Sequence, residues 1–266
     1  MRQKTIKNIA SCKGIGLHTG EISFLEFRPA EEGAGIYFLH KGKKIGALAA
    51  NIVSTNRGSV LASISTVEHV LAAVAGLGLD NVEIYLDGPE PPALDGSAKG
   101  FADLLRDAQM VEQNAECQVI PVSAPIKIDS GDSFVEIVPD DHLSIEAFID
   151  YSHTIAGTMT AKYDERTDDF EKEIAPARTF GLLEEVEALK NAGLAKGAST
   201  DNAIAITKTG YSSPLRFDNE LARHKIVDII GDMALAGKRI RGKILSHKGG
   251  HKLNVALVRR ITNASS

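Results

Sequence analysis

The chain has 266 residues, 43% of them hydrophobic and 24% charged, with a formal net charge of −5 at pH 7. This composition is typical of globular proteins, and it gives no reason to expect nucleic-acid binding, which needs a basic patch. Apolar runs stay well short of the ~20 residues of a membrane span. The two cysteines, Cys12 and Cys117, form no CxxC pair, so neither a disulfide framework nor a zinc knuckle is expected.

The first ten residues lack the apolar segment of a signal peptide, which favours a cytoplasmic location. Residues 22–27 and 36–40 are bounded by turn residues and predict two strands that pair antiparallel. Three glycines in residues 14–20 predict a tight turn that presents His18.

Residues 64–79 predict a buried helix, because Val67, Val70, Leu71 and Val74 share one apolar face. Ser65 and Glu68 match a capping box, and Glu68 and His69 project away from the apolar face. One interpretation is a helix cap followed by a polar position. The other is a metal ligand, His69, beside a carboxylate that can deprotonate water.

Residues 80–86 predict a strand, and residues 87–92 a rigid connection rich in proline. A helix with Ser97 as its N-cap follows, with Phe101, Leu104 and Leu105 on its apolar stripe. Residues 109–117 are polar and show no periodicity. A new series of strands begins at Gln118, so we expect two domains, residues 1–117 and 118–266.

In the second half, residues 126–129, 134–138 and 143–149 alternate apolar and polar side chains, as in a half-buried antiparallel sheet. Further strands are predicted at residues 202–207 and 240–246, and a glutamate-rich helical run ends near residue 193. Each half therefore combines several strands with one or two helices on one face. The predicted fold class is α+β, formed by two similar domains that each contain a mainly antiparallel sheet with two helices.

The predicted helix at residues 215–232 carries His224, Asp228 and Asp232 on one stripe, opposite an apolar face. An imidazole and a carboxylate one turn apart can bind one zinc ion, and a further carboxylate can orient the ligands. The alternative is a solvated polar face. A catalytic zinc usually takes three protein ligands, so the rest of the chain should supply one more.

Residues 247–251, His-Lys-Gly-Gly-His, predict a close backbone approach to a ligand at Gly250, with the cation of Lys248 beside it. The alternative is a basic surface turn between two strands.

Several motifs now occur in one order along the chain. They are Gly-Leu-His-Thr-Gly at 16–20, Ser-Thr-Val-Glu-His at 65–69, Leu-Asp-Gly-Ser at 94–97, Ala-Arg-Thr-Phe-Gly at 177–181, Arg-His-Lys-x-x-Asp-x-x-Gly-Asp at 223–232 and Gly-Gly-His-x-Leu-Asn at 249–254. This order resembles the UDP-3-O-acyl-N-acetylglucosamine deacetylase family, the zinc amidases of lipid A biosynthesis in Gram-negative bacteria. The resemblance implies two α+β domains whose helices are sandwiched between two sheets.

The resemblance also implies site residues. Zn²⁺ would be bound by His69, His224 and Asp228, with Glu68 as general base and His251 as the acid that protonates the leaving amine. Asp232 would orient His251, and Thr179 would stabilise the oxyanion. The expected contacts with a UDP-linked acylated glucosamine are Tyr151, Phe180, Leu182, Lys225, Lys248 and Gly250.

An insert around residues 182–199 forms the acyl passage in this family, and its apolar side chains Leu182, Leu183, Val186, Leu189 and Leu194 predict the same here. The loop at 55–64 is shorter than the family pattern. Ala198 stands where a second glycine is expected, and Ser152 and Thr154 replace an asparagine and a proline.

Two alternatives to this enzyme are a zinc amidohydrolase for another acylated amine and a metal-stabilised binding module without turnover. Glu68 argues against the module, because a structural zinc site needs no base and is usually closed by four protein ligands. We expect the chain to act as a monomer.

Overall fold

The computed structural model describes residues 1–264. The elements of the first half, in chain order, are β1 (Arg2–Ile6), β2 (Ala10–Ile15), β3 (Ile22–Pro29), β4 (Ile36–His40), β5 (Lys43–Gly46), η1 (Ala49–Asn51), β6 (Ile52–Ser54), β7 (Val60–Leu61), α1 (Glu68–Gly76), β8 (Val82–Leu86), α2 (Lys99–Asp107) and β9 (Met110–Glu116). Those of the second half are β10 (Val119–Pro121), β11 (Ile126–Ser130), β12 (Ser133–Val138), β13 (Leu143–Tyr151), β14 (Gly157–Asp164), η2 (Phe170–Ile174), β15 (Phe180–Leu182), η3 (Leu183–Glu185), α3 (Val186–Asn191), β16 (Ile204–Ile206), α4 (Glu220–Ala234), β17 (Arg239–His247) and α5 (His251–Ala264).

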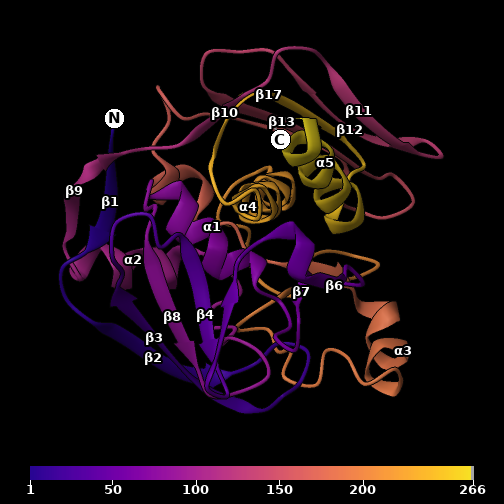
Figure 1. Ribbon diagram of the computed structural model, residues 1–266. Coiled ribbons are helices and arrows are strands. Elements are labelled where there is room, and N and C mark those ends of the chain that lie inside the picture. The colour runs from indigo at the N-terminus through magenta and orange to yellow at the C-terminus, as the bar shows by residue number, and fades with distance from the viewer. Residues whose placement is uncertain (265–266) are drawn as a thin grey trace.

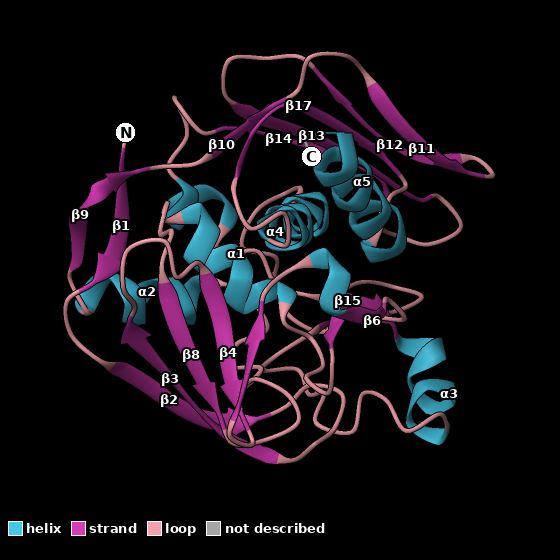
Figure 2. Cartoon of the chain, viewed as in Figure 1, coloured by secondary structure: helices cyan, strands magenta, loops and turns pink. Residues whose placement is uncertain are grey.

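The helices α1, α2, α4 and α5 lie between two sheets, one from each half of the chain (Figures 1 and 2). The first sheet has the strand order β2-β3-β8-β4-β5, and the second has the order β11-β12-β17-β13-β14, with β10 beside the start of β17. This arrangement confirms the α+β class and the sheet-helix-helix-sheet sandwich.

The first sheet buries one face because its strands alternate. Leu25 and Phe27 of β3 point into the core, where Phe27 meets Phe101 of α2 edge to face at 6.2 Å between ring centroids. The expected antiparallel pairing of residues 22–27 with 36–40 is wrong. Strand β8 lies between them, antiparallel to β3 and parallel to β4, and α1 lies in the long connection that a parallel pair needs.

Residues 109–117, in which the sequence shows no periodicity, contain β9, which pairs antiparallel with β1. Its side chains alternate between exposed and half-buried, and most of them are polar. The pair forms a ribbon beside the main layers (Figure 1). A strand at such an edge does not need the apolar periodicity from which strands are predicted.

The second sheet covers α4 and α5 with the inward residues of its alternating strands. Val135, Ile137, Ile145 and Ile244 are buried, and α4 contacts β13 and β14 while α5 contacts β11 and β12. Each such side chain contributes about 1.5–3 kcal/mol on full burial. The strands predicted at residues 126–129, 134–138, 143–149 and 240–246 are confirmed.

Helices α1 and α4 cross at the centre of the molecule. A Cβ atom on Gly231 would lie 2.1 Å from the carbonyl oxygen of Glu68, so only glycine permits this approach. The apolar face predicted for α4 is confirmed, since Ile226, Val227 and Ile230 are buried. The crossing brings the polar stripe of α4 against the first turn of α1.

Helix α5 was not expected from the sequence. It begins at His251, so residues 247–251 join a strand to a helix, and the alternative of a turn between two strands is wrong. Leu253, Leu257 and Ile261 bury its apolar stripe. The local pattern Lys-Gly-Gly is typical of a hairpin turn. The helix forms after it because the apolar stripe of α5 packs against α4 and the second sheet.

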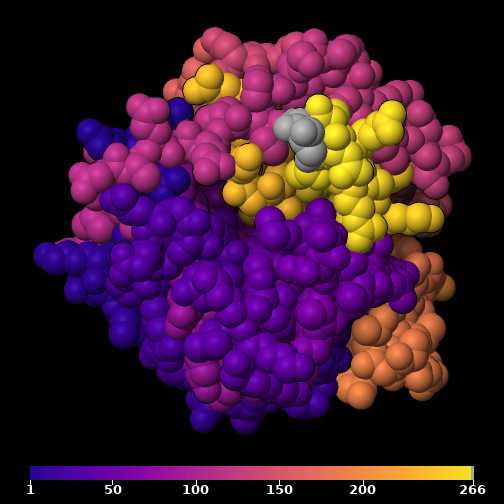
Figure 3. Space-filling model, in the orientation of Figure 1, coloured from indigo at the N-terminus to yellow at the C-terminus, as the bar shows by residue number. Residues whose placement is uncertain are grey.

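The insert at 182–199, coloured orange in Figure 3, projects from one side of the molecule against the first half of the chain. Every residue of α3 within it is at least partly exposed. Among residues 1–264, no helix combines the length and apolar character required to cross a bilayer.

Candidate active site

His69 of α1 meets His224 and Asp228 of α4 at the helix crossing. Their ligand-type atoms all lie within 4.8 Å of one another, and each residue is at most 7% exposed. Asp228 Oδ1 lies 3.3 Å from His224 Nε2 and 3.8 Å from His69 Nε2. The structure therefore brings together all three residues expected to bind a metal ion.

The protonation of these groups suits a metal ion. Burial lowers the pKa of His69 to about 3 and also lowers that of His224, so both imidazoles are neutral at pH 7. Burial opposes ionisation of Asp228, but Lys225 and the surrounding imidazoles hold its pKa below the usual value. Two imidazole nitrogens and one carboxylate are a donor set that suits a catalytic zinc.

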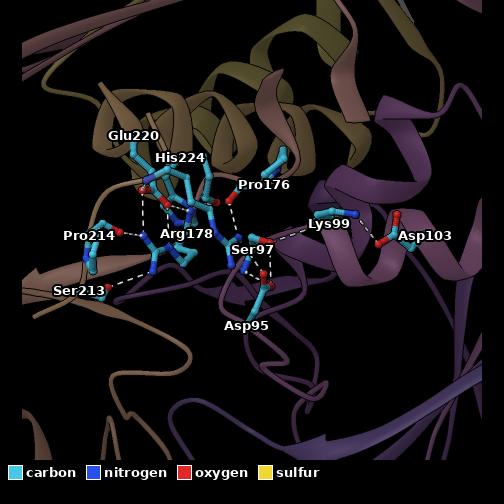
Figure 4. Close-up of polar contacts among 12 residues, drawn as sticks. Asp95, Ser97, Lys99, Asp103, Pro176, Arg178, Ser213, Pro214, Glu220 and His224 are labelled. Carbon is cyan, nitrogen blue, oxygen red and sulfur yellow. Dashed lines mark hydrogen bonds and ion pairs between the residues drawn. The ribbon is translucent and has the colours of Figure 1, made fainter. Parts of the chain in front are cut away.

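His224 is held in the orientation that a ligand requires. Its Nδ1 lies 3.0 Å from the carbonyl oxygen of Ala177, which can only accept, so Nδ1 carries the proton and Nε2 presents a lone pair to the group. The neighbouring Arg178 is buried and donates to Glu220 at the start of α4 through Nε and Nη2, at 2.8 and 3.0 Å. Figure 4 shows Arg178 between Glu220 and the turn at Ser213 and Pro214, close to His224.

Neither Arg178 nor Glu220 was assigned a role from the sequence. Arg178 lay inside a motif quoted for the resemblance, and a buried arginine requires a carboxylate partner. The sequence did not show that Glu220, more than forty residues further along the chain, is this partner.

Glu68 and His251 lie beside the metal-ligand group. His251 Nε2 is 3.6 Å from Glu68 Oε1 and 3.9 Å from Asp228 Oδ2, while His251 Nδ1 bonds Asp232 Oδ2 at 2.8 Å. Glu68 Oε2 accepts from the backbone N–H of Ser59 at 2.9 Å, so this carboxylate does not form the capping box expected with Ser65.

The surroundings of Glu68 and His251 raise the pKa of both side chains. Burial raises the pKa of Glu68 to about 7, against the opposing effect of His251. Burial disfavours the charged form of His251, but Asp232 and Glu68 outweigh it and raise its pKa to about 10. A base that titrates near neutrality thus lies next to a protonated acid.

A pocket of about 510 Å³ contains these groups. Its lining includes most of the substrate contacts expected from the sequence, namely Tyr151, Phe180, Leu182, Lys225 and Gly250, and also Thr179, expected beside the oxyanion. Lys225 Nζ donates to Asp228 Oδ2 at 2.8 Å, and it lies 5.1 Å above the ring of Phe180. Asp232 is behind His251 and outside the lining, as its orienting role would require.

Lys248 is the expected contact that does not line this pocket. Its ammonium group pairs with Asp132 and, at 3.4 Å, with Asp150.

A larger hollow of about 660 Å³ lies elsewhere, between Cys12, Lys99, Pro176 and Arg216, and its lining includes neither the metal-ligand group nor Glu68.

The pocket has two ends, which we call the metal end (Glu68, His69, His224, Asp228 and His251) and the insert end. The insert end comprises the lining residues Leu182, Leu183, Val186 and Leu189, which are those expected for an acyl passage, and Leu17 and Ile204 are further apolar residues of the pocket lining. Leu194 does not line it.

A second cluster of possible ligands, Asp140, Asp141 and His142, lies away from this pocket. Both ring nitrogens of His142 are engaged, Nδ1 with Asp141 at 2.7 Å and Nε2 with Asp164 at 3.0 Å. The hydrogen bond with Asp141 raises the pKa of His142, which disfavours the neutral form that metal binding requires.

A metal-ligand group inside a pocket, next to a base and an acid, defines the class of metal-dependent hydrolases. Residues 3–263 match the family described as UDP-3-O-acyl N-acetylglycosamine deacetylase. A UDP-3-O-acyl-N-acetylglucosamine deacetylase of Myxococcus xanthus is 40% identical over 274 aligned residues, which cover 99% of this chain and 87% of that protein.

Proteins of the same name from Acidithiobacillus ferrooxidans and Helicobacter hepaticus are also 40% identical, and each alignment covers 98% of this chain and 90% of the relative. The chain therefore belongs to the UDP-3-O-acyl N-acetylglycosamine deacetylase family.

Proposed function

We propose that this chain hydrolyses the N-acetyl group of a UDP-3-O-acyl-N-acetylglucosamine, releasing acetate and the free amine, and that zinc is its metal. The observation that carries the proposal is the meeting of His69, His224 and Asp228 with Glu68 and His251 in one pocket. When bound there, zinc supplies Lewis-acid chemistry to the amide carbonyl and to the attacking water.

The chain's own residues move the protons. Glu68, whose pKa lies near neutrality, takes a proton from the attacking water as oxygen bonds to the acetyl carbon. His251 Nε2, which lies 3.6 Å from Glu68 Oε1, delivers its proton to the amide nitrogen as the C–N bond breaks. Asp232 fixes the ring through Nδ1, and the Thr179 hydroxyl donates to the oxyanion.

The two ends of the pocket match the two parts of this substrate. The glucosamine would contact Phe180 and Tyr151 beside the metal end, and the fatty acyl chain would leave along the insert end. Gly250 gives the backbone room beside the sugar. Lys225 would face the charged part of the substrate from the pocket lining, and Lys248 would face it from outside the lining, in exchange for its ion pairs with Asp132 and Asp150.

The domain division at residues 117 and 118 is part of the same proposal. Under it, the first domain supplies Glu68 and His69 and the second supplies His224, Asp228 and His251, so the reaction takes place where the domains meet. All these residues belong to one chain, which supports a monomer as the active form. We place the reaction in the cytoplasm, as the committed step of lipid A biosynthesis.

The test is to measure zinc content together with acetate release from a UDP-3-O-acyl-N-acetylglucosamine. Stoichiometric zinc with acetate release supports the proposal. Turnover of other N-acylated amines, without turnover of the UDP-sugar, would mean that the substrate is another acylated amine. Zinc retention without any hydrolysis would make the chain a binding module.

A further inference from the structure

Ser59, in the loop between β6 and β7, lies between the carboxylates of Glu68 and Asp232. It is 0% exposed, its backbone N–H donates to Glu68 Oε2 at 2.9 Å, and its hydroxyl donates to Asp232 Oδ1 at 2.6 Å. Glu68 begins α1, whereas Asp232 lies near the end of α4. One residue thus joins the proposed base to the carboxylate that orients the proposed acid.

The loop gives Ser59 little freedom to move. Its carbonyl oxygen accepts from the N–H of Val67, immediately before α1, at 3.2 Å. A Cβ atom on the preceding Gly58 would lie 3.0 Å from Glu68 Oε1, so the backbone passes directly against this carboxylate. The Ser59 backbone is therefore fixed to the start of α1, and its hydroxyl reaches across to α4.

Asp232 depends on this hydroxyl. Within residues 1–264 it accepts from Ser59 Oγ at Oδ1, and from His251 Nδ1 and Asn254 Nδ2 at Oδ2, at 2.8 and 2.9 Å. A fully buried carboxylate needs such donors, since burial without them is costly. The hydroxyl and the two donors on α5 hold opposite oxygens, which fixes the plane of the carboxylate and hence the orientation of the His251 ring.

We infer that Ser59 is a positioning residue that sets the geometry between Glu68 and His251, acting on the second through Asp232. The inference rests on the proposed function for its effect on turnover. The hydrogen bonds of Ser59 join it to Glu68, Asp232 and Val67, none of which is a proposed metal ligand or substrate contact, so its hydroxyl should affect proton delivery without affecting zinc or substrate binding. Ser59→Ala should lower kcat about 10- to 100-fold, in the range found for partners that orient reacting groups.

The experiment compares Ser59→Ala and Ser59→Thr with Ser63→Ala, a change at an exposed serine between β7 and α1. We expect Ser59→Ala to lose kcat with KM and zinc content unchanged, Ser59→Thr to recover much of the loss, and Ser63→Ala to match the unsubstituted chain. In a double-mutant cycle, Ser59→Ala should cost little further activity in a His251→Ala background, because both changes remove the same function. Independent, additive losses would overturn the inference.

A second readout does not need turnover. The Nδ1–H resonance of His251, assigned by its disappearance in His251→Ala, should shift in Ser59→Ala because its acceptor has lost a donor. An unchanged resonance together with an unchanged kcat would overturn the inference. If the unsubstituted chain releases no acetate, the proposed function fails, and the resonance alone still decides whether Ser59 holds Asp232 and His251. If Ser59→Ala fails to fold, Ser59→Cys, with its weaker donor, takes its place and should show an intermediate shift.

Discussion

The metal end and the insert end of the pocket are built in different ways. At the metal end the ligands lie on α1 and α4, are almost completely buried, and are held by outer hydrogen bonds such as that from His224 to Ala177. At the insert end the lining comes from a projecting segment, and Leu183 is 51% exposed. Under the proposed function, the difference means that side chains are held rigidly where the amide bond would break, whereas the end that would hold the acyl chain needs only an apolar surface.

The insert is joined to the first half of the chain partly through exposed side chains. Arg57 of the loop before α1 pairs with Glu185 of the insert at 2.9 Å, but the two side chains are 48% and 39% exposed. His18 accepts from the N–H of Ala195 at 3.3 Å and bonds the carbonyl oxygen of Arg57 at 2.9 Å. Substitutions at the metal end should therefore act on kcat, and those at the insert end on KM.

The largest effect should follow loss of the metal-ligand group. A chain with His69, His224 and Asp228 all changed to Ala should lose both zinc and activity, because all three members of the metal-ligand group are removed. Metal analysis and acetate release measure this. His142→Ala is the matched control and should keep its zinc. Stoichiometric zinc in the triple variant would mean that the metal binds elsewhere.

Glu68→Gln tests whether chemistry at the metal end can be separated from metal binding. We expect kcat to fall about 10²-fold or more, within the usual range for a general base, with zinc retained. The amide cannot take a proton, but it can still accept from Ser59. Near-normal kcat at full zinc occupancy would exclude Glu68 as the base.

Asp232→Asn should be milder, and its signature should appear in the pH profile. Glu68 works ionised, so kcat/KM should rise through its pKa, raised to about 7, and His251 works protonated, so the rate should fall through its pKa, raised to about 10. Because Glu68 and His251 are close enough to titrate together, the two limbs describe the pair and not either residue alone. Removing the charge of Asp232 lowers the pKa of His251, so the basic limb should move to lower pH; an unmoved limb contradicts this assignment.

At the insert end, Leu182→Gln should raise KM for a long-chain substrate about tenfold, roughly 1.4 kcal/mol, with kcat almost unchanged. Leu194→Gln, in the same insert but outside the pocket lining, is the control. Kinetics with substrates of different acyl length measure the effect. Equal behaviour of the two variants would place the passage elsewhere.

Arg57→Ala should have the smallest effect. Exposed ion pairs contribute about 0–1 kcal/mol and weaken with salt, so KM should change by about threefold or less, and by less still at high salt. Glu185→Ala should behave alike. A large loss of kcat in either variant would show that the insert controls the chemistry, and would remove the distinction between the two ends.

The sequence allowed the chemistry to be predicted better than the topology. The stripe of His224, Asp228 and Asp232 depends only on helix periodicity, and in the structure His224 and Asp228 line the pocket while Asp232 bonds His251 behind it. The position of β8 between β3 and β4, by contrast, is a long-range pairing that no local pattern contains. Ser59 escaped notice for the same reason, because a serine in a loop has no distinguishing periodicity, and its partner is Asp232 on another helix.

Gly231 shows what such a crossing demands. It lies against the carbonyl of Glu68 and between two residues of the polar stripe, Asp228 and Asp232, so the axes of α1 and α4 can approach only as far as a missing methyl group allows. Coordination bonds tolerate errors of about 0.2 Å, far less than the displacement that one added carbon would force. The distance between His69 on α1 and its partners His224 and Asp228 on α4 is thus set by a residue that has no side chain.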